Sequence, residues 1–391
     1  GNNTTSSNYY FKRIPKASFN NADIIYVHTS GYYYTSTYAI DSTGKLWGWG
    51  RNNYGQLGLG NTTDQTTPQE ITNVAGSQLL GKKVVHLQAN QDDDDQGKCW
   101  VLTDEGKLYF FGYLENYGYS TGYYDSSNTT SQTMPQLLTN SSTLWNSNDQ
   151  KVVYFVTNNN RYSTLYIITD GGSTGATQKL YATGDNAYAQ QGTATSTSSN
   201  VSSSTQGTGI NNWFGKELQF RDLGQDWNDQ SNQNIVNESF GNWDSFQTGG
   251  SNAGKMVIGK IVKIMPKGYS GENANRVVLI DEYGQLFAAG YWNYQMFPNT
   301  ELDNESNMRS GPADNSTDQV YSDSFYPVNQ FPGKVVDYCH VGPTNSENAW
   351  HVLTDAGVLY VGGDSSWSQN GFYYGGYHGF WRYQWNLGGN T

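Results

Sequence analysis

An all-β fold, a single β-propeller of about five four-stranded blades, is predicted by a repeated hairpin, by a composition that suits strands and turns, and by few Leu-rich helical stretches. The 391 residues include 45 Gly, 31 Tyr and 12 Trp. Aromatic residues favour strands, and Gly favours the tight turns that join them. Many short strands are therefore expected, and long helices are not.

The repeated hairpin consists of an apolar strand, a polar turn that ends in Gly, and a strand of the form Leu-aromatic-x-x-Gly. This unit occurs at residues 39–50, 101–112, 167–184, 279–290 and 352–363. In the third copy, a Gly-rich tip separates residues 167–170 from residues 179–184. A single hairpin cannot bury both of its faces, so the copies are expected to stack around a ring and protect each other's edges.

The repeat predicts one domain over residues 1–391, divided into five blades. The blades are expected over approximately residues 22–81, 82–149, 150–257, 258–333 and 334–391, with a long insertion at 222–257. The interval between Gly184 and Gly290 spans 106 residues, so a sixth blade within 185–289 is an alternative. An insertion is favoured, because residues 228–253 are rich in Asn, Gln, Ser and Gly and offer little apolar material for strands.

An N-terminal segment, residues 9–19, has the pattern of an outer strand. Elsewhere in the chain, an outer strand that contains Pro, as at Pro68 or Pro327, precedes a β-branched run. The N-terminal segment contains Pro15 and leads directly into residues 23–27, but no hairpin unit precedes it. We therefore expect residues 9–19 to pair with the last blade as its outer strand and to close the ring.

One copy of the repeat carries a family resemblance. Residues 44–60 read Gly-Lys-Leu-Trp-Gly-Trp-Gly-Arg-Asn-Asn-Tyr-Gly-Gln-Leu-Gly-Leu-Gly. This segment resembles the repeat of the regulator of chromosome condensation family, and the weaker copies extend the resemblance from about Ala22 to Gly371. The resemblance implies a bladed propeller whose relatives mostly bind other proteins; one branch catalyses nucleotide exchange on a small GTPase. Family propellers usually have more blades than the five repeats found here.

The charge excludes several classes of partner. Only 14% of the residues are charged, and the net charge is −12. A chain without a basic surface does not neutralise phosphates, so neither nucleic acid nor an anionic membrane is an expected partner. No apolar run approaches the roughly 18 to 20 residues that span a bilayer, so membrane insertion is not expected.

The search for catalytic or metal-binding residues is largely negative. The five His residues include no pair at helical spacing. Residues 171–175 match the nucleophile-elbow string, but a polar hairpin tip follows them instead of a helix. Asp93 and Asp95, in a run of four Asp residues, are a weak Ca²⁺ candidate, and a solvated acidic loop is the favoured interpretation. We therefore expect neither an enzyme nor a cofactor.

Two aromatic clusters are candidates for binding other proteins. The connections between the first and second strands of the blades should emerge on one face, and the end of the chain is rich in Trp and Tyr. The alternative is that these aromatic residues only cover short turns or pack within the last blade. The predicted binding residues are Tyr32, Tyr33, Tyr34, Arg161 and Tyr269 in the first cluster and Tyr374, Trp381 and Trp385 in the second.

Cysteines and glycosylation sequons bear on the compartment. Cys99 and Cys339 permit one disulfide, but two free thiols are favoured. The sequons would suit a secreted glycoprotein, although a chain rich in Asn, Ser and Thr yields about this many by chance. The candidate asparagines are Asn3, Asn61, Asn128, Asn140, Asn200, Asn237, Asn304 and Asn315.

These features favour a non-enzymatic structural or interaction protein. The first interpretation is a secreted, extracellular or cell-surface propeller subunit that assembles with itself into a fibre or surface layer. A polar N-terminus and an aromatic C-terminus are unlike surfaces, which produce head-to-tail assemblies. One alternative, implied by the resemblance, is a cytoplasmic protein-binding module or guanine-nucleotide exchange factor. Another is a lectin built on Trp and Tyr platforms.

Overall fold

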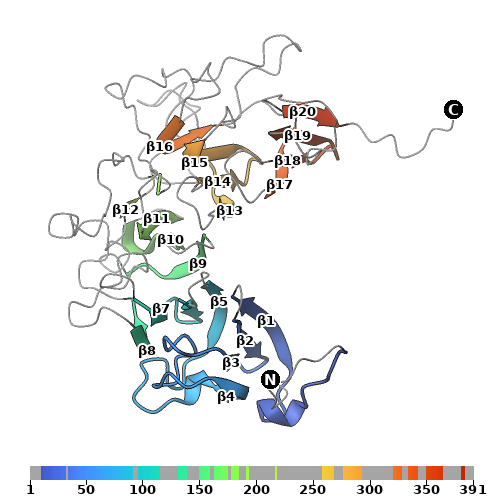
Figure 1. The fold of residues 1–391 in the computed structure, drawn as a ribbon. Coiled ribbons are helices and arrows are strands. Elements are labelled where there is room, and N and C mark those ends of the chain that lie inside the picture. Colours follow the sequence, from blue (N-terminus) through green and yellow to red (C-terminus); the bar gives the residue numbers. More distant parts are fainter. Residues whose placement is uncertain are drawn as a thin grey trace. The chain divides into compact units, whose positions relative to one another are not determined.

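The all-β prediction is confirmed by a computed structural model of the protein. The structure describes residues 10–31, 34–90, 96–114, 131–138, 149–158, 163–174, 178–184, 191–192, 216–217, 258–267, 276–292, 320–327, 333–341, 349–363 and 380–383. In these ranges, the strands form five four-stranded sheets (Figure 1), and helical structure is limited to short 3-10 turns. Within each sheet, consecutive strands of the sequence are neighbours, so each sheet is a meander.

The first sheet contains β1 (Ile24–Ser30), β2 (Ser36–Asp41), β3 (Leu46–Gly50) and β4 (Gln65–Glu70). The second contains β5 (Val84–Asn90), β6 (Lys98–Thr103), β7 (Leu108–Tyr113) and β8 (Ser131–Leu137). The third contains β9 (Val152–Thr157), β10 (Thr164–Thr169), β11 (Lys179–Gly184) and β12 (Lys216–Glu217). The fourth contains β13 (Ile261–Lys267), β14 (Arg276–Asp281), β15 (Leu286–Trp292) and β16 (Val320–Pro327). The fifth contains β17 (Val335–Val341), β18 (Ala349–Thr354), β19 (Leu359–Gly363) and β20 (Phe380–Tyr383). The 3-10 helices are η1 (Lys16–Phe19), η2 (Ile71–Asn73) and η4 (Gly172–Thr174).

The chain divides into two compact units, and its organisation as one domain of five blades stays a prediction. Unit 1 comprises Gly1–Thr174, Thr183–Asp185 and Val201–Lys216, and unit 2 comprises Gly175–Ala182, Asn186–Asn200 and Glu217–Thr391. In the third sheet, β9 and β10 lie in unit 1, and most of β11 lies in unit 2. Within the described ranges the five sheets are the only ones, and most of residues 185–289 lies outside those ranges.

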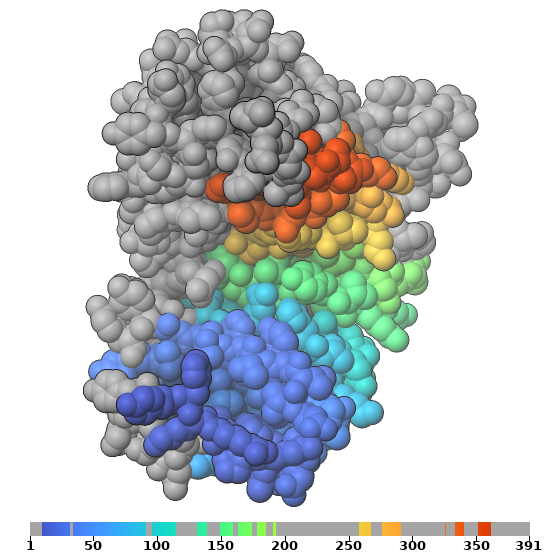
Figure 2. Space-filling model, turned by 90° about the vertical axis from the view of Figure 1, so that its right-hand side faces the viewer, coloured from blue at the N-terminus to red at the C-terminus, as the bar shows by residue number. Residues whose placement is uncertain are grey.

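The predicted closing strand at residues 9–19 is wrong. Residues 10–15 have no regular structure, and residues 16–19 form the 3-10 helix η1. The outer place in the fifth sheet is taken by β20, which pairs antiparallel with β19. The N-terminal segment instead lies on the first sheet, as the darkest blue atoms in Figure 2 show. The reason is packing: Phe19 is buried among aromatic side chains of that sheet.

Neighbouring sheets bury the side chains of the repeat against each other. In unit 1, one face of the first sheet, called the trailing face, packs on the opposite face of the second sheet, called the leading face. The trailing face presents Tyr38, Ile40 and Leu46, and the leading face presents Val101, Tyr109 and Phe111. In unit 2, Val278, Ile280 and Leu286 of the fourth sheet pack in the same way on Val352 and Tyr360 of the fifth. The repeat therefore supplies two apolar faces per sheet, as predicted.

The Gly that ends the repeat unit is required by the backbone in the first four copies, which end at Gly50, Gly112, Gly184 and Gly290. Gly50 and Gly112 have φ angles of 104° and 110°, a region that side chains rarely allow. A Cβ atom at Gly112 would lie 2.3 Å from the carbonyl oxygen of Gly97, and one at Gly50 would lie 2.3 Å from that of Thr35. These glycines thus let the second and third strands stay in register at the point where the hairpin opens.

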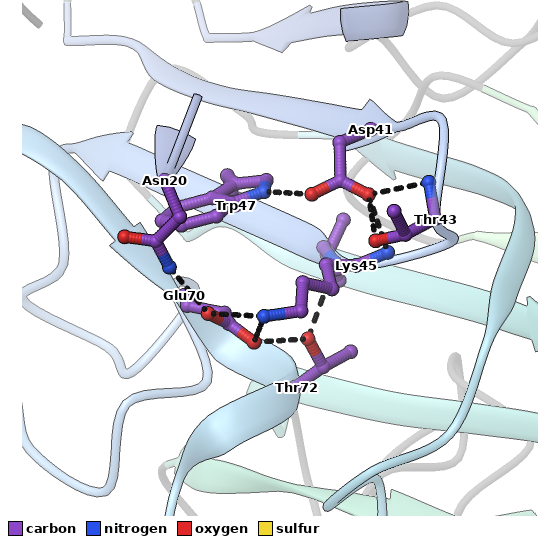
Figure 3. Close-up of polar contacts among 8 residues, drawn as sticks. Asn20, Asp41, Thr43, Lys45, Trp47, Glu70 and Thr72 are labelled. Carbon is purple, nitrogen blue, oxygen red and sulfur yellow. Dashed lines mark hydrogen bonds and ion pairs between the residues drawn. The ribbon is translucent and has the colours of Figure 1, made fainter. Parts of the chain in front are cut away.

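The hairpin turns of the first and fourth sheets are held by carboxylates whose surroundings differ. Asp41 accepts hydrogen bonds from the backbone N–H of Thr43 at 2.9 Å and Lys45 at 3.1 Å, and from Trp47 Nε1 at 2.9 Å (Figure 3). Burial raises the pKa of Asp41, but these hydrogen bonds outweigh it and leave the pKa below its usual value. At the equivalent Asp281, burial dominates and raises the pKa despite a similar set of donors. Both turns are therefore fixed by the side chain that begins them.

The third residue in the first strand of a sheet contacts the equivalent residue in the first strand of a neighbouring sheet. In unit 1, the ring of His86 on β5 stacks on Tyr154 of β9 with centroids 5.4 Å apart, and lies 6.3 Å from the ring of Tyr26 on β1. In unit 2, the equivalent Lys263 and Asp337 form an ion pair, whose hydrogen bond lowers the pKa of Asp337. One position of the repeat thus joins sheets by aromatic contacts in unit 1 and by charge in unit 2.

Substitution of the terminal glycine tests the backbone argument. We expect Gly112→Ala to lower the free energy of unfolding by about 3 kcal/mol, because the new methyl group meets a fixed carbonyl oxygen. Gly76→Ala is the matched control, since Gly76 also has a positive φ, 81°, but its Cβ would meet nothing within 4 Å. The control should lose only about 1 to 2 kcal/mol. Urea unfolding of both variants measures the difference, and equal losses would contradict the steric explanation.

His86 predicts a dependence of stability on pH. Burial lowers the pKa of His86, and its Nε2 atom is buried without a hydrogen-bond partner. The unfolded chain therefore takes up a proton more readily than the folded chain, and stability should fall as the pH drops below about 6.5. His86→Phe should keep the ring contacts and lose part of this fall. Unfolding at about pH 7.5 and about pH 5.5 gives the comparison; an unchanged pH dependence in the variant would refute the assignment.

Candidate protein-interaction surface

The first strand of every sheet in the described ranges begins with a β-bulge at the same place. The first and third residues of this strand pair with adjacent residues of the second strand, so the second residue has no pairing partner. These second residues, called the bulge residues, are all β-branched and between 50% and 67% exposed. They are Ile25, Val85 and Val153 in unit 1 and Val262 and Val336 in unit 2. A bulge re-aims a side chain, and here it presents an apolar one to solvent.

A short common sequence produces each bulge. A charged residue is followed by two β-branched residues, and the first of the two packs inward while the second is exposed. The five copies are Asp23-Ile24-Ile25, Lys83-Val84-Val85, Lys151-Val152-Val153, Lys260-Ile261-Val262 and Lys334-Val335-Val336. In a regular strand, successive side chains point to opposite faces. Two successive apolar β-branched residues depart from the expected alternation of apolar and polar side chains, so the pair marks the start of the first strand in the sequence. The bulge itself is visible only in the structure, and the predicted binding set therefore omits these residues.

In the second, third and fifth sheets, a backbone hydrogen bond fixes the bulge beside the hairpin turn of the preceding sheet. The N–H of Val84 donates to the carbonyl oxygen of Gly44 at 2.8 Å, that of Val152 donates to Gly106 at 3.0 Å, and that of Val335 donates to Gly284 at 3.0 Å. A Cβ atom at Gly106 would lie only 2.5 Å from Cβ of Lys151. The turn glycine thus allows the next strand to begin at close range, and the bulge residues stand on rigid backbone.

Charged side chains surround the bulge residues. Each lysine that precedes a bulge is exposed, and so is a carboxylate in the hairpin turn of the same sheet. In three sheets the lysine N–H donates to that carboxylate: Lys151 to Asp170 at 2.9 Å, Lys260 to Glu282 at 2.8 Å and Lys334 to Asp355 at 3.0 Å. The two signs of charge alternate, so this surface does not attract phosphates. Exposed apolar side chains bordered by mixed charges have the composition of a protein-binding surface.

The apolar surface is most extensive in unit 1. Val27 on β1 is 57% exposed, and Tyr154 on β9 is 38% exposed. The first strands of the three sheets lie side by side, since His28 Nε2 of β1 lies 2.8 Å from the carbonyl oxygen of Ala89 on β5. The His86 and Tyr154 rings join β5 to β9. The bulge residues of unit 1, Ile25, Val85 and Val153, therefore lie on three adjacent strands, β1, β5 and β9.

Most of the predicted binding residues lie outside the described residues. Tyr34 is described, 55% exposed, and its ring lies 4.9 Å from the guanidinium carbon of Arg51. Trp381 lies in β20. The others, which lie outside the described ranges, are Tyr32, Tyr33, Arg161, Tyr269, Tyr374 and Trp385. The predicted set therefore stays a prediction, and the surface that the described residues present is a different one, at the beginning of the first strands.

The remaining predicted sites have mixed outcomes. Cys99 and Cys339 are both free thiols, and Cys99 is buried. Asn61 is exposed, and its amide donates to the carbonyl oxygen of Leu59 at 3.2 Å. Asp93, Asp95 and the other sequon asparagines, Asn3, Asn128, Asn140, Asn200, Asn237, Asn304 and Asn315, lie outside the described residues. Occupancy of the sequons and of the Ca²⁺ candidate stays a prediction.

Two further searches concern the described ranges only. No group of three or more His, Cys, Asp or Glu side chains there could hold a metal ion. Among the helices of those ranges, none combines the length and the apolar character that crossing a membrane requires.

Comparison with known proteins identifies one repeat directly. The model of the regulator of chromosome condensation (RCC1) repeat matches residues 43–89. The human and mouse E3 ubiquitin-protein ligases HERC2 are each 34% identical to this chain over 94 residues, which is 24% of the chain. The match spans only 2% of either ligase.

Solved structures with partial similarity to this chain were also found. Human WBSCR16 aligns with 92% of this chain and 66% of its own, at 15% identity and a TM-score of 0.49. Prp20p from Saccharomyces cerevisiae aligns with 94% of this chain and 76% of its own, at 15% identity and a TM-score of 0.43. The chain therefore contains a segment, residues 43–89, that matches the RCC1 repeat, and it is similar to HERC2 over 94 residues.

Proposed function

We propose that this protein is a protein-binding module, and that a contact surface is centred on the three bulge residues of unit 1, Ile25, Val85 and Val153. The observation that carries the proposal is the repetition. Five equivalent positions, in five sheets, expose a β-branched apolar side chain to solvent. The match of residues 43–89 to the RCC1 repeat supports the same function, because this resemblance implies relatives that mostly bind other proteins.

Strand formation alone does not explain the apolar character of these positions. Thr is β-branched, favours strands and carries a polar hydroxyl, so it would suit an exposed strand residue better than Val. The chain uses Thr freely in other strands, as at Thr66 and Thr67 of β4, yet the bulge positions carry Val or Ile in every copy. Exposed apolar side chains with a common function, such as contact with a partner, account for this choice.

The proposal makes binding, not catalysis, the activity of the protein. Yeast Prp20p has binding properties toward Gsp1p and histones, and exchange-factor activity on a small GTPase is the second candidate for this chain. Self-assembly into a fibre or surface layer, glycosylation and extracellular location also stay predictions. Most of the residues on which they rest, such as Tyr374 and Trp385, lie outside the described ranges.

A double substitution tests the proposed surface. Val85→Asp with Val153→Asp should weaken binding of a protein partner by at least about tenfold, because two charges would be buried in an apolar contact. Both side chains are about half exposed, at 54% and 52%, so the melting temperature should change little. Partners are identified by cross-linking and mass spectrometry from the native source, and their affinity for purified variants is then measured.

Tyr34→Asp is the matched control. Tyr34 is 55% exposed, close to the value for Val85, but it lies in the connection that follows β1, away from the start of the strand. The control should keep full affinity. Loss of the partner in the Tyr34 variant with retention in the Val85 and Val153 variant would place the site on the strand connections and refute the proposal. Accelerated nucleotide release from a GTPase partner would add exchange activity to the binding.

A further inference from the structure

The leading face of the first sheet is covered by the N-terminal segment. Positions 101, 109 and 111 of the second sheet pack on the sheet before it, and Ala39, Trp47 and Trp49 hold the equivalent positions in the first sheet. These three residues form a core with Phe19 instead, and Ile14 packs against the same core. Residues 10–20, called the cap, thus occupy in unit 1 the place that a preceding sheet occupies elsewhere.

Aromatic contacts hold the cap. The ring of Phe19 meets Trp47 edge-on, with centroids 5.6 Å apart and planes at 88°. It also lies 5.9 Å from the ring of Trp49. Phe19 is only 5% exposed, so a single aromatic residue supplies most of the buried anchor.

The rest of the cap is held weakly. Lys16 and Asp23 form an ion pair at 2.7 Å with both side chains largely exposed. Asn20 Nδ2 donates to Glu70 Oε2 at 3.3 Å on the surface, where Lys45 also binds the carboxylate (Figure 3). Exposed pairs of this kind contribute little. Tyr10 and Phe11, at the start of the cap, are exposed to 85% and 109%. The cap can therefore leave the sheet at the expense of one aromatic anchor and a few surface contacts.

The connection between the cap and β1 is a sharp turn of unusual backbone. Asn20 and Asn21 have φ angles of 51° and 63°, in the left-handed region. Asn tolerates this region better than other residues with a side chain, but it has no preference for two such angles in succession. Only Ala22 and Asp23 separate this turn from β1. An extended connection would relieve the left-handed conformation and carry the cap away from its own sheet.

We propose that the cap exchanges between two copies of this chain, so that Phe19 of each copy packs on Trp47 and Trp49 of the other. Each copy then keeps the contacts that the cap makes in a single chain, and the connection at Asn20 and Asn21 becomes extended. Exchange of an identical element is a low-cost route to a dimer. A short connection in a tight conformation favours such exchange, because opening it releases strain. The partner of this surface is therefore a second copy of the protein.

Paired substitutions in the connection provide the test. Asn20→Val with Asn21→Val disfavours the left-handed angles and should stabilise the exchanged dimer. Asn20→Gly with Asn21→Gly accepts these angles without strain and should favour the monomer. Both variants lose the Asn20 contact with Glu70, so this contact does not distinguish them. Light scattering coupled to size-exclusion chromatography, from about 1 μM to about 1 mM, should give a dimer dissociation constant at least about tenfold lower for the Val pair.

Phe19→Ser separates exchange from other kinds of dimer. Added to the Val pair, it should abolish the dimer, because the exchanged cap loses its anchor. Hydrogen exchange should show β3 of the Val-pair dimer to be as protected as β3 of the monomer, since Trp47 and Trp49 stay covered. Equal dissociation constants for the Val and Gly pairs, a dimer that survives Phe19→Ser, or a monomer at every concentration would each overturn the proposal.

Discussion

A four-stranded sheet with apolar side chains on both faces needs a layer on each side, and the packing of the described sheets follows from this need. The repeat meets it by alternating its side chains. Tyr38 and Ile40 turn one way and pack on the second sheet, while Ala39 turns the other way. Burial of each face removes apolar surface from water, at about 25 cal/mol per Å². Sheets that pack together thus stabilise each other, and a sheet face without a neighbour needs a substitute.

The first sheet shows what such a substitute looks like. Its leading face carries Trp47 and Trp49, large side chains that a preceding sheet would otherwise cover. Ile14 and Phe19 provide the cover, although the segment that holds them forms a 3-10 turn and not a strand. This replacement leaves the cover of the leading face with few anchoring contacts.

The bulges link this architecture to the proposed function. Close approach of consecutive sheets is possible because the hairpin turn ends in Gly, as at Gly106 beside Lys151. That approach fixes where the next first strand begins, and the bulge then directs Val153 outward. A surface made in this way is as rigid as the sheets themselves. Rigid apolar side chains lose little conformational entropy when a partner binds them, which suits a binding module.

Features that depend on local chemistry could be predicted from the amino-acid sequence. The five hairpin units, their turns and the terminal glycines such as Gly112 were predictable, because tight reversals and positive φ angles demand particular residues at short spacing. The beginnings of the first strands were also marked, through runs such as Lys83-Val84-Val85.

Features that depend on contacts between distant residues became visible only in the folded chain. Two successive β-branched residues do not reveal a bulge, because the extra residue is defined by its pairing partners, Thr103 for Val84 and Leu102 for His86. The segment with Ile14 and Phe19 has the composition of a strand, but it packs on Trp47 and Trp49 and covers a face of the first sheet instead of pairing in a sheet. Which residues become exposed, and which cover the first sheet, followed from the packing of whole sheets.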